Sequence, residues 1–355
     1  MADKIRVLVV DDSALVRQLV SQILASDPGI EVVATAPDPY VARDKIMELK
    51  PDVMTLDVEM PRMDGLTFLE KVMKGRPMPV VMCSSLTEAG CAETLRALEL
   101  GAVDYIAKPK SDVRDLLPQL RAEVISKVKA AAGARMSRVG APRTPAKPIA
   151  ATAALRIGAT ERVICVGAST GGTEALKEFL TAFPAEAPSV VVVQHMPEKF
   201  TQAFAGRLNE VCQVRVKEAQ DRDRCLPGRV LIAPGAFHMK VVKDGAGCIV
   251  RIVDEPPINH HKPSVDVMFD SCAQALGARA VGVIMTGMGD DGANGMLRMR
   301  QAGARTLAQA EASCVVFGMP KVAIERGGVE QVLPLDQLAG RALELAAQPL
   351  SALAG

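Results

Sequence analysis

Short apolar runs alternate with longer amphipathic segments over about the first 125 residues of the chain. Short runs rich in Val and Ile are typical of buried parallel strands, and amphipathic segments between them are typical of helices that cover a sheet. Five strands are therefore predicted, at Ile5–Val10, Glu31–Ala34, Val53–Leu56, Val80–Cys83 and Ala102–Ile106. Because strand and helix alternate, the pattern predicts a doubly wound parallel sheet, whose ligands bind beyond the carboxyl ends of the strands.

The same alternation returns after residue 160 and predicts a second α/β domain. Its strands are expected at Val163–Val166, Val190–Val193, Val214–Val216, Val230–Ile232, Val281–Met285 and Thr306–Ala308. The segment from Lys240 to Arg251 has two strand-like runs around Asp244–Gly245, which predicts an inserted hairpin with that pair as its turn. The second domain is therefore expected to be a parallel sheet with one antiparallel insertion.

A change in composition separates the two domains. Between Ser126 and Thr160 the chain has seven basic residues and no acidic one, and alanine, glycine and proline fill most of the rest. Such a segment buries too little apolar surface to offset the entropy of ordering, which predicts an extended tether. We therefore expect a first domain at 1–129, a basic linker at 130–160 and a second domain at 161–349.

Charge and cysteine content narrow the class of protein further. The net charge is +1 and the basic linker has no interleaved aromatic residues, so nothing indicates nucleic-acid binding. The eight cysteines include no Cys-x-x-Cys pair, which indicates neither a zinc site nor a disulfide framework. No apolar stretch is long enough to cross a bilayer and the first residues have no signal-peptide pattern, so we expect a cytoplasmic protein.

Charged and hydroxyl side chains stand where the strands of the first domain end. They are Asp11 and Asp12 after the first strand, Asp57 after the third, Ser84 after the fourth and Lys108 after the fifth. Because these ends meet at one edge of a parallel sheet, the three carboxylates would repel one another unless a cation lay between them. Oxygen ligands of this kind suit Mg²⁺, and a lysine with a hydroxyl suits a phosphoryl group on a carboxylate. Helix capping would explain one of these acids but not the set.

The second domain has a Gly-x-Ser-x-Gly arrangement directly after its first predicted strand. Ser169 lies between Gly167 and Gly171, and a helix-forming run begins at Thr173. A serine on a tight strand-to-helix turn needs small neighbours, and the N–H groups of the following helix favour developing negative charge. The pattern predicts a nucleophile. A phosphate-binding loop or a plain glycine-rich turn is the alternative, but a P-loop would have lysine where Thr173 stands.

Two further strand ends carry residues that could act with this serine. His195 follows the second strand, and Asp290 and Asp291 follow the strand expected at Val281–Met285. Strand ends of one parallel sheet meet in space, so the histidine could accept the serine proton while an acid orients the imidazole. The competitors for the role of base are His238, His260 and His261.

The loop with the two acids also matches a dinucleotide fingerprint. Gly287, Gly289 and Gly292 follow a strand, and Glu311 comes about twenty residues later. The Asp290–Asp291 pair opposes this interpretation, because two negative charges would repel a pyrophosphate there. A dinucleotide-binding module and a non-enzymatic partner-binding domain remain the alternatives to an enzyme.

Residues 4–125 resemble the receiver domain of bacterial two-component signalling. The matching stretches are Val9–Ser13, Leu56–Gly65 and Ala107–Pro109. The resemblance implies a flavodoxin-like fold in which Asp57 accepts phosphate from a histidine kinase. It implies that Asp12, Asp57 and the Glu59 main chain hold Mg²⁺, with Asp11 contributing through water. Ser84, Tyr105 and Lys108 match the hydroxyl, aromatic switch and phosphoryl-contact positions.

Residues 160–345 resemble the catalytic domain of the chemotaxis protein-glutamate methylesterases, the CheB family. The matching stretches are Gly167–Gly172, Gln194–Pro197, Ala233–Gly235, Pro263–Asp266, Thr286–Gly292 and Gly318–Pro320. The resemblance implies a Rossmann-like α/β/α fold with Ser169 as nucleophile, His195 as base and Asp291 as orienting acid. It also makes the main-chain N–H of Met288 a candidate oxyanion donor. Asp290 stands where the family often has Asn, and we favour Asp291 as the third member.

Together the two resemblances imply a response regulator that is also a hydrolase. It would remove methyl esters from γ-glutamyl residues of chemoreceptors and deamidate particular receptor glutamines, under the control of a chemotaxis histidine kinase. The esterase reaction would need no cofactor, and the implied partners include neither nucleic acid nor a membrane into which the chain inserts.

Overall fold

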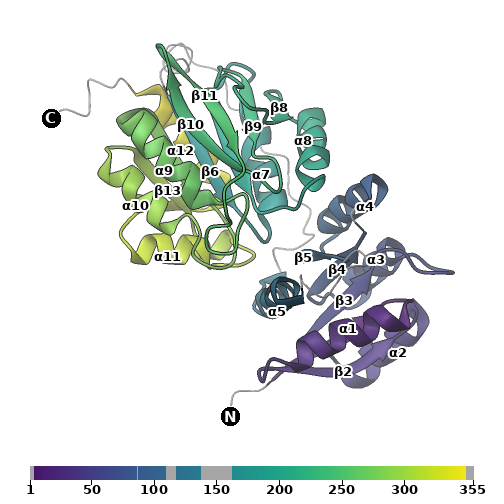
Figure 1. Cartoon of the computed structure of the whole chain (residues 1–355). Helices are drawn as coiled ribbons and strands as arrows, with labels where there is room; N and C mark the ends of the chain where they lie inside the picture. The colour runs from purple at the N-terminus through teal and green to yellow at the C-terminus, as the bar shows by residue number, and fades with distance from the viewer. Residues whose placement is uncertain (1–3, 86, 109–116, 137–161, 349–355) are drawn as a thin grey trace. The chain divides into compact units, whose positions relative to one another are not determined.

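The computed structural model describes residues 4–85, 87–108, 117–136 and 162–348 (Figure 1). The chain divides into two compact units, Met1–Pro142 and Arg143–Gly355. Most of the linker expected at 130–160 lies outside the described residues. Within the parts that are described, no helix is both long enough and apolar enough to cross a bilayer.

The first unit is built on a five-stranded parallel sheet. Its strands are β1 (Ile5–Val10), β2 (Ile30–Ala36), β3 (Val53–Asp57), β4 (Val80–Ser84) and β5 (Asp104–Ala107). They lie in the order β2-β1-β3-β4-β5, so all five predicted strands are confirmed and the sheet is doubly wound. The chain reverses its direction of travel across the sheet between β1 and β3, which is the switch point where such sheets bind ligands.

Among the described residues of this unit, five helices cover the sheet on both faces. They are α1 (Ala14–Ala25), α2 (Pro39–Leu49), α3 (Gly65–Gly75), α4 (Glu88–Glu99) and α5 (Leu117–Ala132). The first and fifth helices pack against each other on one face, and α3 packs against α4 on the other (Figure 1). Side chains that accept hydrogen bonds from first-turn N–H groups begin four of the helices, as helix capping requires: Ser13, Asp38, Asp64 and Thr87.

The second unit contains a seven-stranded parallel sheet. Its strands are β6 (Val163–Ala168), β7 (Ser189–Gln194), β8 (Arg215–Glu218), β9 (Arg229–Ile232), β12 (Ala280–Ile284), β13 (Arg305–Gln309) and β14 (Gln331–Leu333). The order is β14-β13-β12-β6-β7-β9-β8, with β6 at the centre. The chain leaves β6 towards β7 and later returns to its other side at β12. The carboxyl ends of these three strands therefore border one switch-point crevice.

The helices of the second unit form a layer on each face of this sheet. They are α7 (Gly172–Thr181), α8 (Phe200–Val211), α9 (Val265–Leu276), α10 (Ala293–Gln301), α11 (Met319–Glu325) and α12 (Leu335–Ala347). The helix pairs α9–α10 and α10–α11 pack together (Figure 1). Helix α12 packs against α7. Strands β6 and β7 are buried along their whole length, which explains their uninterrupted apolar sequences.

The structure differs from the sequence prediction in two details of this unit. The hairpin forms from β10 (His238–Asp244) and β11 (Gly247–Val253), but its two turn residues are Gly245 and Ala246, one position later than predicted. Gly245 has φ +59°, which suits a glycine at the first turn position. The edge strand β14 was not predicted, because three residues with an exposed Val332 are too short to show a pattern.

The start of α3 provides a test of the packing in the first unit. A Cβ on Gly65 would lie 2.0 Å from the backbone oxygen of Asp57, whereas a Cβ on Gly75 at the other end of the helix would meet nothing within 4 Å. We predict that Gly65→Ala lowers the free energy of unfolding by about 1–3 kcal/mol. Gly75→Ala is the matched control and should leave that free energy unchanged or raise it by up to about 1 kcal/mol.

The measurement is urea unfolding of the full chain followed by tyrosine fluorescence. The chain has no tryptophan, and its two tyrosines, Tyr40 and Tyr105, both lie in the first unit, so this signal reports that unit alone. Equal midpoints for the two variants would contradict the close approach at Gly65.

Candidate functional site

The switch point of the first sheet gathers the acidic residues that the sequence singled out. Carboxylate oxygens of Asp11, Asp12 and Asp57 all lie within 4.8 Å of one another. Asp11 and Asp57 are buried, and Asp12 is exposed. The Lys108 Nζ reaches the cluster from the end of β5 and lies 2.7 Å from Asp57 Oδ1 and 2.9 Å from Asp11 Oδ2.

Burial is the main influence on the pKa of Asp57. It raises the pKa of Asp57 to about 6, the negative charge of Asp11 adds to the rise, and the hydrogen bond from Lys108 opposes it. Burial lowers the pKa of Lys108, but its hydrogen bonds and charge attraction to Asp57 and Asp11 outweigh this and raise the pKa. The cluster therefore carries more negative charge than one lysine compensates.

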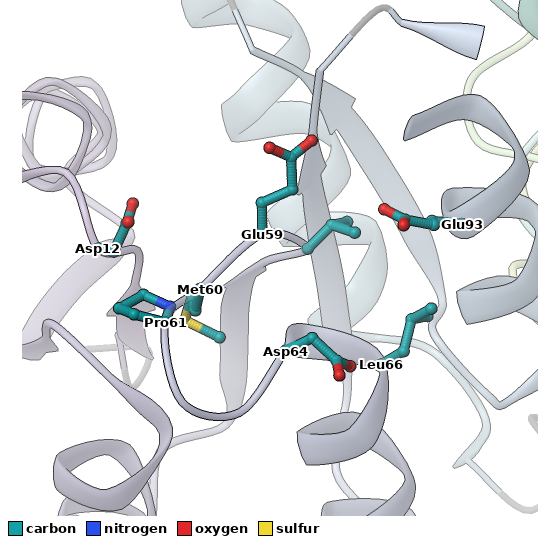
Figure 2. A pocket seen from close by; sticks show the side chains of 8 residues that line it. Asp12, Glu59, Met60, Pro61, Asp64, Leu66 and Glu93 are labelled. Carbon is teal, nitrogen blue, oxygen red and sulfur yellow. The ribbon is translucent and has the colours of Figure 1, made fainter. Parts of the chain in front are cut away.

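The residues of this cluster fit a divalent cation. Asp57 Oδ2 is buried and accepts no hydrogen bond among the described residues, so it is an anionic ligand atom without a donor. A cavity of about 390 Å³ opens beside the cluster, and Figure 2 shows Asp12, Glu59, Asp64 and Glu93 around it. Mg²⁺ prefers carboxylate and carbonyl oxygens and retains waters, which this open acidic cavity allows.

The two switch candidates of the first unit, Ser84 and Tyr105, lie in β4 and β5. Ser84 is buried at the end of β4, and its hydroxyl donates to the carbonyl oxygen of Gly90 at 3.1 Å. Tyr105 is also buried, with the ammonium of Lys127 4.8 Å from its ring centroid. Ser84 is linked directly to Lys108, because the Lys108 N–H donates to the Ser84 carbonyl at 2.7 Å.

Close packing explains why glycines, and not larger residues, surround Ser169. A Cβ on Gly167 would lie 2.3 Å from Val265 Cγ1, and one on Gly172 would lie 2.1 Å from Gln194 Oε1. Gly171 has φ +75°, a conformation that residues with side chains rarely adopt. The turn between β6 and α7 can therefore form only with small residues beside the serine, as the sequence pattern predicted.

The register of the sheet places Ser169 next to His195. Ala168 of β6 is paired with Gln194 of β7, so Ser169 and His195 are the next residues on two neighbouring strands. The His195 N–H donates to the Ala168 carbonyl at 3.1 Å, and the Ser169 N–H donates to the Thr286 carbonyl at 3.0 Å. Ser169 therefore lies between the segments that follow β7 and β12.

Asp291 is fully buried and is bound on both carboxylate oxygens. Its Oδ2 accepts hydrogen bonds from His195 Nε2 at 2.8 Å and from the Val265 N–H at 2.7 Å. Its Oδ1 accepts from Ser264 Oγ at 2.8 Å and from the Asp266 N–H at 3.0 Å. Val265 and Asp266 begin α9, so the carboxylate lies at the positive end of a helix.

These donors keep Asp291 ionised despite its burial. Burial raises its pKa, but the hydrogen bond and charge of His195 and the N–H groups of Asp266 and Val265 lower the pKa to about 2. An ionised carboxylate only accepts hydrogen bonds, so His195 Nε2 carries the hydrogen and Nδ1 is the basic nitrogen. Nδ1 is buried and has no hydrogen-bond partner in the described part of the chain.

The neighbouring acid, Asp290, makes different contacts. Its Oδ2 accepts a hydrogen bond from Arg326 Nη2 at 2.7 Å, and its side chain is 47% exposed. Arg326 also donates to Asn294 Oδ1 at 2.8 Å. Asp290 therefore takes part in a surface ion pair, whereas Asp291 faces His195.

The remaining candidates lie around the same crevice. Met288 is in the segment between β12 and α10, where its Cα would lie 3.1 Å from a Cβ on Gly318. Both ring nitrogens of His238 are engaged, Nε2 with the Pro256 carbonyl and Nδ1 with the Ser264 N–H. His260 is exposed, and His261 stacks on the ring of His195.

Sequence reasoning assigned no role to two residues that hold this site. Ser264 caps α9 and donates to Asp291, and Gln194 Nε2 donates to the Ser169 carbonyl at 2.9 Å. A serine before an apolar helical run could have predicted the cap. The bond to Asp291 could not be predicted this way, because the two residues are 27 positions apart.

The fold and the two clusters define the chain as a receiver sheet joined to an α/β unit with a serine, a histidine and an aspartate at one crevice. The family description "Response regulator receiver domain" matches residues 7–121, and "CheB methylesterase" matches residues 164–342. The chain belongs to the family of CheB methylesterases, the protein-glutamate methylesterases/protein-glutamine glutaminases, that carry a receiver domain.

Individual relatives agree with this assignment over nearly the whole chain. A protein of Syntrophotalea carbinolica named protein-glutamate methylesterase/protein-glutamine glutaminase is 56% identical, over 97% of this chain and 98% of its own length. A protein of Rhizobium johnstonii with the same name, numbered 2, is also 56% identical, over 97% of this chain and 98% of its own length. The crystal structure of the Thermotoga maritima CheB methylesterase catalytic domain has a TM-score of 0.51 and 36% identity. The match covers 52% of this chain and 98% of the Thermotoga maritima chain.

These findings decide between the functions that the sequence left open. Relatives of this similarity are named as enzymes, so the dinucleotide-binding and non-enzymatic alternatives for the second domain are wrong. The glycine-rich loop after β12 instead carries Asp291 towards His195.

Proposed function

We propose that this chain hydrolyses γ-glutamyl methyl esters of chemoreceptors and deamidates particular receptor glutamines. The contact that carries the proposal is the 2.8 Å bond between His195 Nε2 and the buried carboxylate of Asp291, next to a strand register that sets Ser169 beside His195. The names of the relatives supply the substrate class, glutamate esters and glutamines in proteins. The receiver unit supplies the link to phosphorylation-dependent signalling by a response regulator.

The reaction follows from the basic nitrogen that Asp291 leaves on His195. His195 Nδ1 takes the proton of Ser169 Oγ as this oxygen attacks the ester carbonyl, and the C–O bond to the methoxy group then breaks. The imidazolium returns its proton to the leaving group, so methanol departs and an acyl-serine remains. Water, deprotonated by the same nitrogen, hydrolyses this ester and frees the glutamate. With a glutamine substrate the leaving group is ammonia.

Main-chain N–H groups stabilise the oxyanion of this reaction. The N–H of Met288 is the proposed donor, because the segment after β12 passes beside Ser169. The Ser169 N–H donates to the Thr286 carbonyl and so holds this segment beside the serine. Loss of one oxyanion donor typically reduces the rate by about 10²–10³-fold. The esterase reaction needs no cofactor in this mechanism.

We propose Asp57 as the phosphoryl acceptor of the receiver unit, with a chemotaxis histidine kinase as donor. Asp12, Asp57 and the Glu59 main chain would hold Mg²⁺, with Asp11 acting through water. When bound, the ion neutralises charge on the acidic cluster. Lys108 contacts the phosphoryl group, and Ser84 and Tyr105 act as the switch residues. Phosphorylation then raises the rate of the esterase.

The proposed domain limits are 1–129 for the receiver, 130–160 for the linker and 161–349 for the esterase. We place the protein in the cytoplasm, where a reducing environment suits its eight free cysteines. Its partners are chemoreceptors and the kinase. Nucleic acid and membrane insertion play no part in the proposal.

The central test is methanol release from methylated receptor fragments. Ser169→Ala and His195→Ala should each lower the rate by about 10³-fold or more, because the nucleophile and the base act as one unit. Circular dichroism should show that both variants stay folded. Methanol release by folded Ser169→Ala at the wild-type rate would refute the assignment.

The two adjacent acids give a matched comparison. Asp291→Asn should lower the rate by about 10²–10⁴-fold, because an amide no longer fixes the tautomer of His195. Asp290→Asn should retain at least about half of the rate, because it changes only an exposed ion pair with Arg326. A larger loss for Asp290→Asn than for Asp291→Asn would assign the orienting role to Asp290.

Regulation is tested with a small phosphodonor such as acetyl phosphate and Mg²⁺. Asp57→Asn should keep the basal rate of methanol release and lose the stimulation, because the variant has no carboxylate to phosphorylate. Asp44→Asn changes an exposed acid of α2 and should be stimulated as the wild type is. Equal stimulation of Asp57→Asn and Asp44→Asn would disprove phosphorylation at Asp57.

A further inference from the structure

The ring of His261 lies flat on the ring of His195. Their centroids are 3.9 Å apart and their planes differ by 7°. The His195 ring is thus fixed at its edge by Asp291 and covered on one face by a second imidazole. A ring that is bound only at its edge can still tilt about that bond, and a stacked neighbour prevents this tilt.

The backbone around His261 is built to present this ring. Ile258 and His261 exchange two backbone hydrogen bonds, at 2.8 and 3.1 Å, across a tight turn. The two residues inside the turn, Asn259 and His260, have φ values of 50° and 65°. Positive φ at both central positions is the type I′ geometry, which asparagine tolerates better than most residues.

The segment that contains His261 also binds the carboxylate of Asp291. Three positions after His261, Ser264 donates its hydroxyl to Asp291, and the next two backbone N–H groups bind the same carboxylate. Lys262, the residue after His261, forms an ion pair with Asp254, and its Nζ lies 6.0 Å from the ring centroid of Phe237. Residues 258–266 therefore position both side chains that contact the His195 ring, His261 and Asp291.

We propose that His261 is a positioning residue for the esterase, acting through His195. Its ring holds the imidazole so that Nε2 points at Asp291 and Nδ1 is available to Ser169. Its π face also lies against the positive charge that His195 acquires when it takes the serine proton, which is a favourable cation–π arrangement. This proposal rests on the proposed function of Ser169, His195 and Asp291.

The test compares three full-length variants in methanol release. His261→Ala removes the stacked ring and should lower kcat by about 10–100-fold with KM changed less than about threefold, because misplacement of a catalytic group by about 1 Å costs about that much. His261→Phe keeps a flat π face and should recover at least a third of the wild-type kcat. His260→Ala, an exposed neighbour in the same turn, is the control and should match the wild type.

A second readout does not depend on activity. In ¹⁵N-labelled protein the His195 Nε2–H should exchange with water at least about tenfold faster in His261→Ala than in the wild type, and His261→Phe should restore slow exchange. If His261→Ala fails to fold, His261→Leu replaces it, since leucine fills the volume without a flat face. Wild-type kcat in the Ala or Leu variant, or a Phe variant no better than it, would overturn the proposal. Absence of Ser169-dependent methanol release in the wild type would instead refute the proposed function.

Discussion

The second unit depends on one buried charge. Asp291 is removed from water completely, and a carboxylate in that position is stable only when hydrogen-bond donors surround it. Two of the donors are the first N–H groups of α9, one is the hydroxyl that caps this helix, and one is His195. The same bonds that stabilise the charge therefore align a helix, a cap and a base.

Both units solve the problem of placing polar groups in the same way. Each is a parallel sheet with apolar, buried central strands, and its reactive residues lie at the carboxyl ends of those strands or in the loops that follow them. In the first unit the crevice lies between β1 and β3, and in the second it lies between β6 and β12. The first crevice concentrates negative charge for a cation and a phosphoryl group, and the second shields one carboxylate, hydrogen-bonded to a histidine, from solvent.

The sequence predicted the strands and the residues at their ends, because both depend on local features. Buried parallel strands read as short apolar runs, and Ser169, His195 and Asp57 follow such runs directly. The register between β6 and β7 then places Ser169 beside His195 without further information. The family resemblance, rather than spacing, favoured Asp291 over Asp290.

Features that depend on distant segments could not be predicted. The choice between the two acids is made by Ser264 and the start of α9, which lie far from Asp291 in sequence. The strand β14 has no pattern because its residues are partly exposed at a sheet edge. The sequence has four histidines and does not show which of them lies against His195. Only the turn at residues 258–261 brings the His261 ring onto His195.

The tautomer of His195 is the most direct test of the proposed serine–histidine–aspartate mechanism. A ¹⁵N NMR spectrum of the imidazole nitrogens at a pH where the ring is neutral distinguishes a protonated nitrogen from a bare one. The hydrogen bonds of Asp291 predict hydrogen on Nε2, bound to Asp291, and a bare Nδ1 facing the serine. A hydrogen on Nδ1 and none on Nε2 would contradict this mechanism. Neither Nε2 nor an ionised Asp291 would then carry a hydrogen for the bond between them.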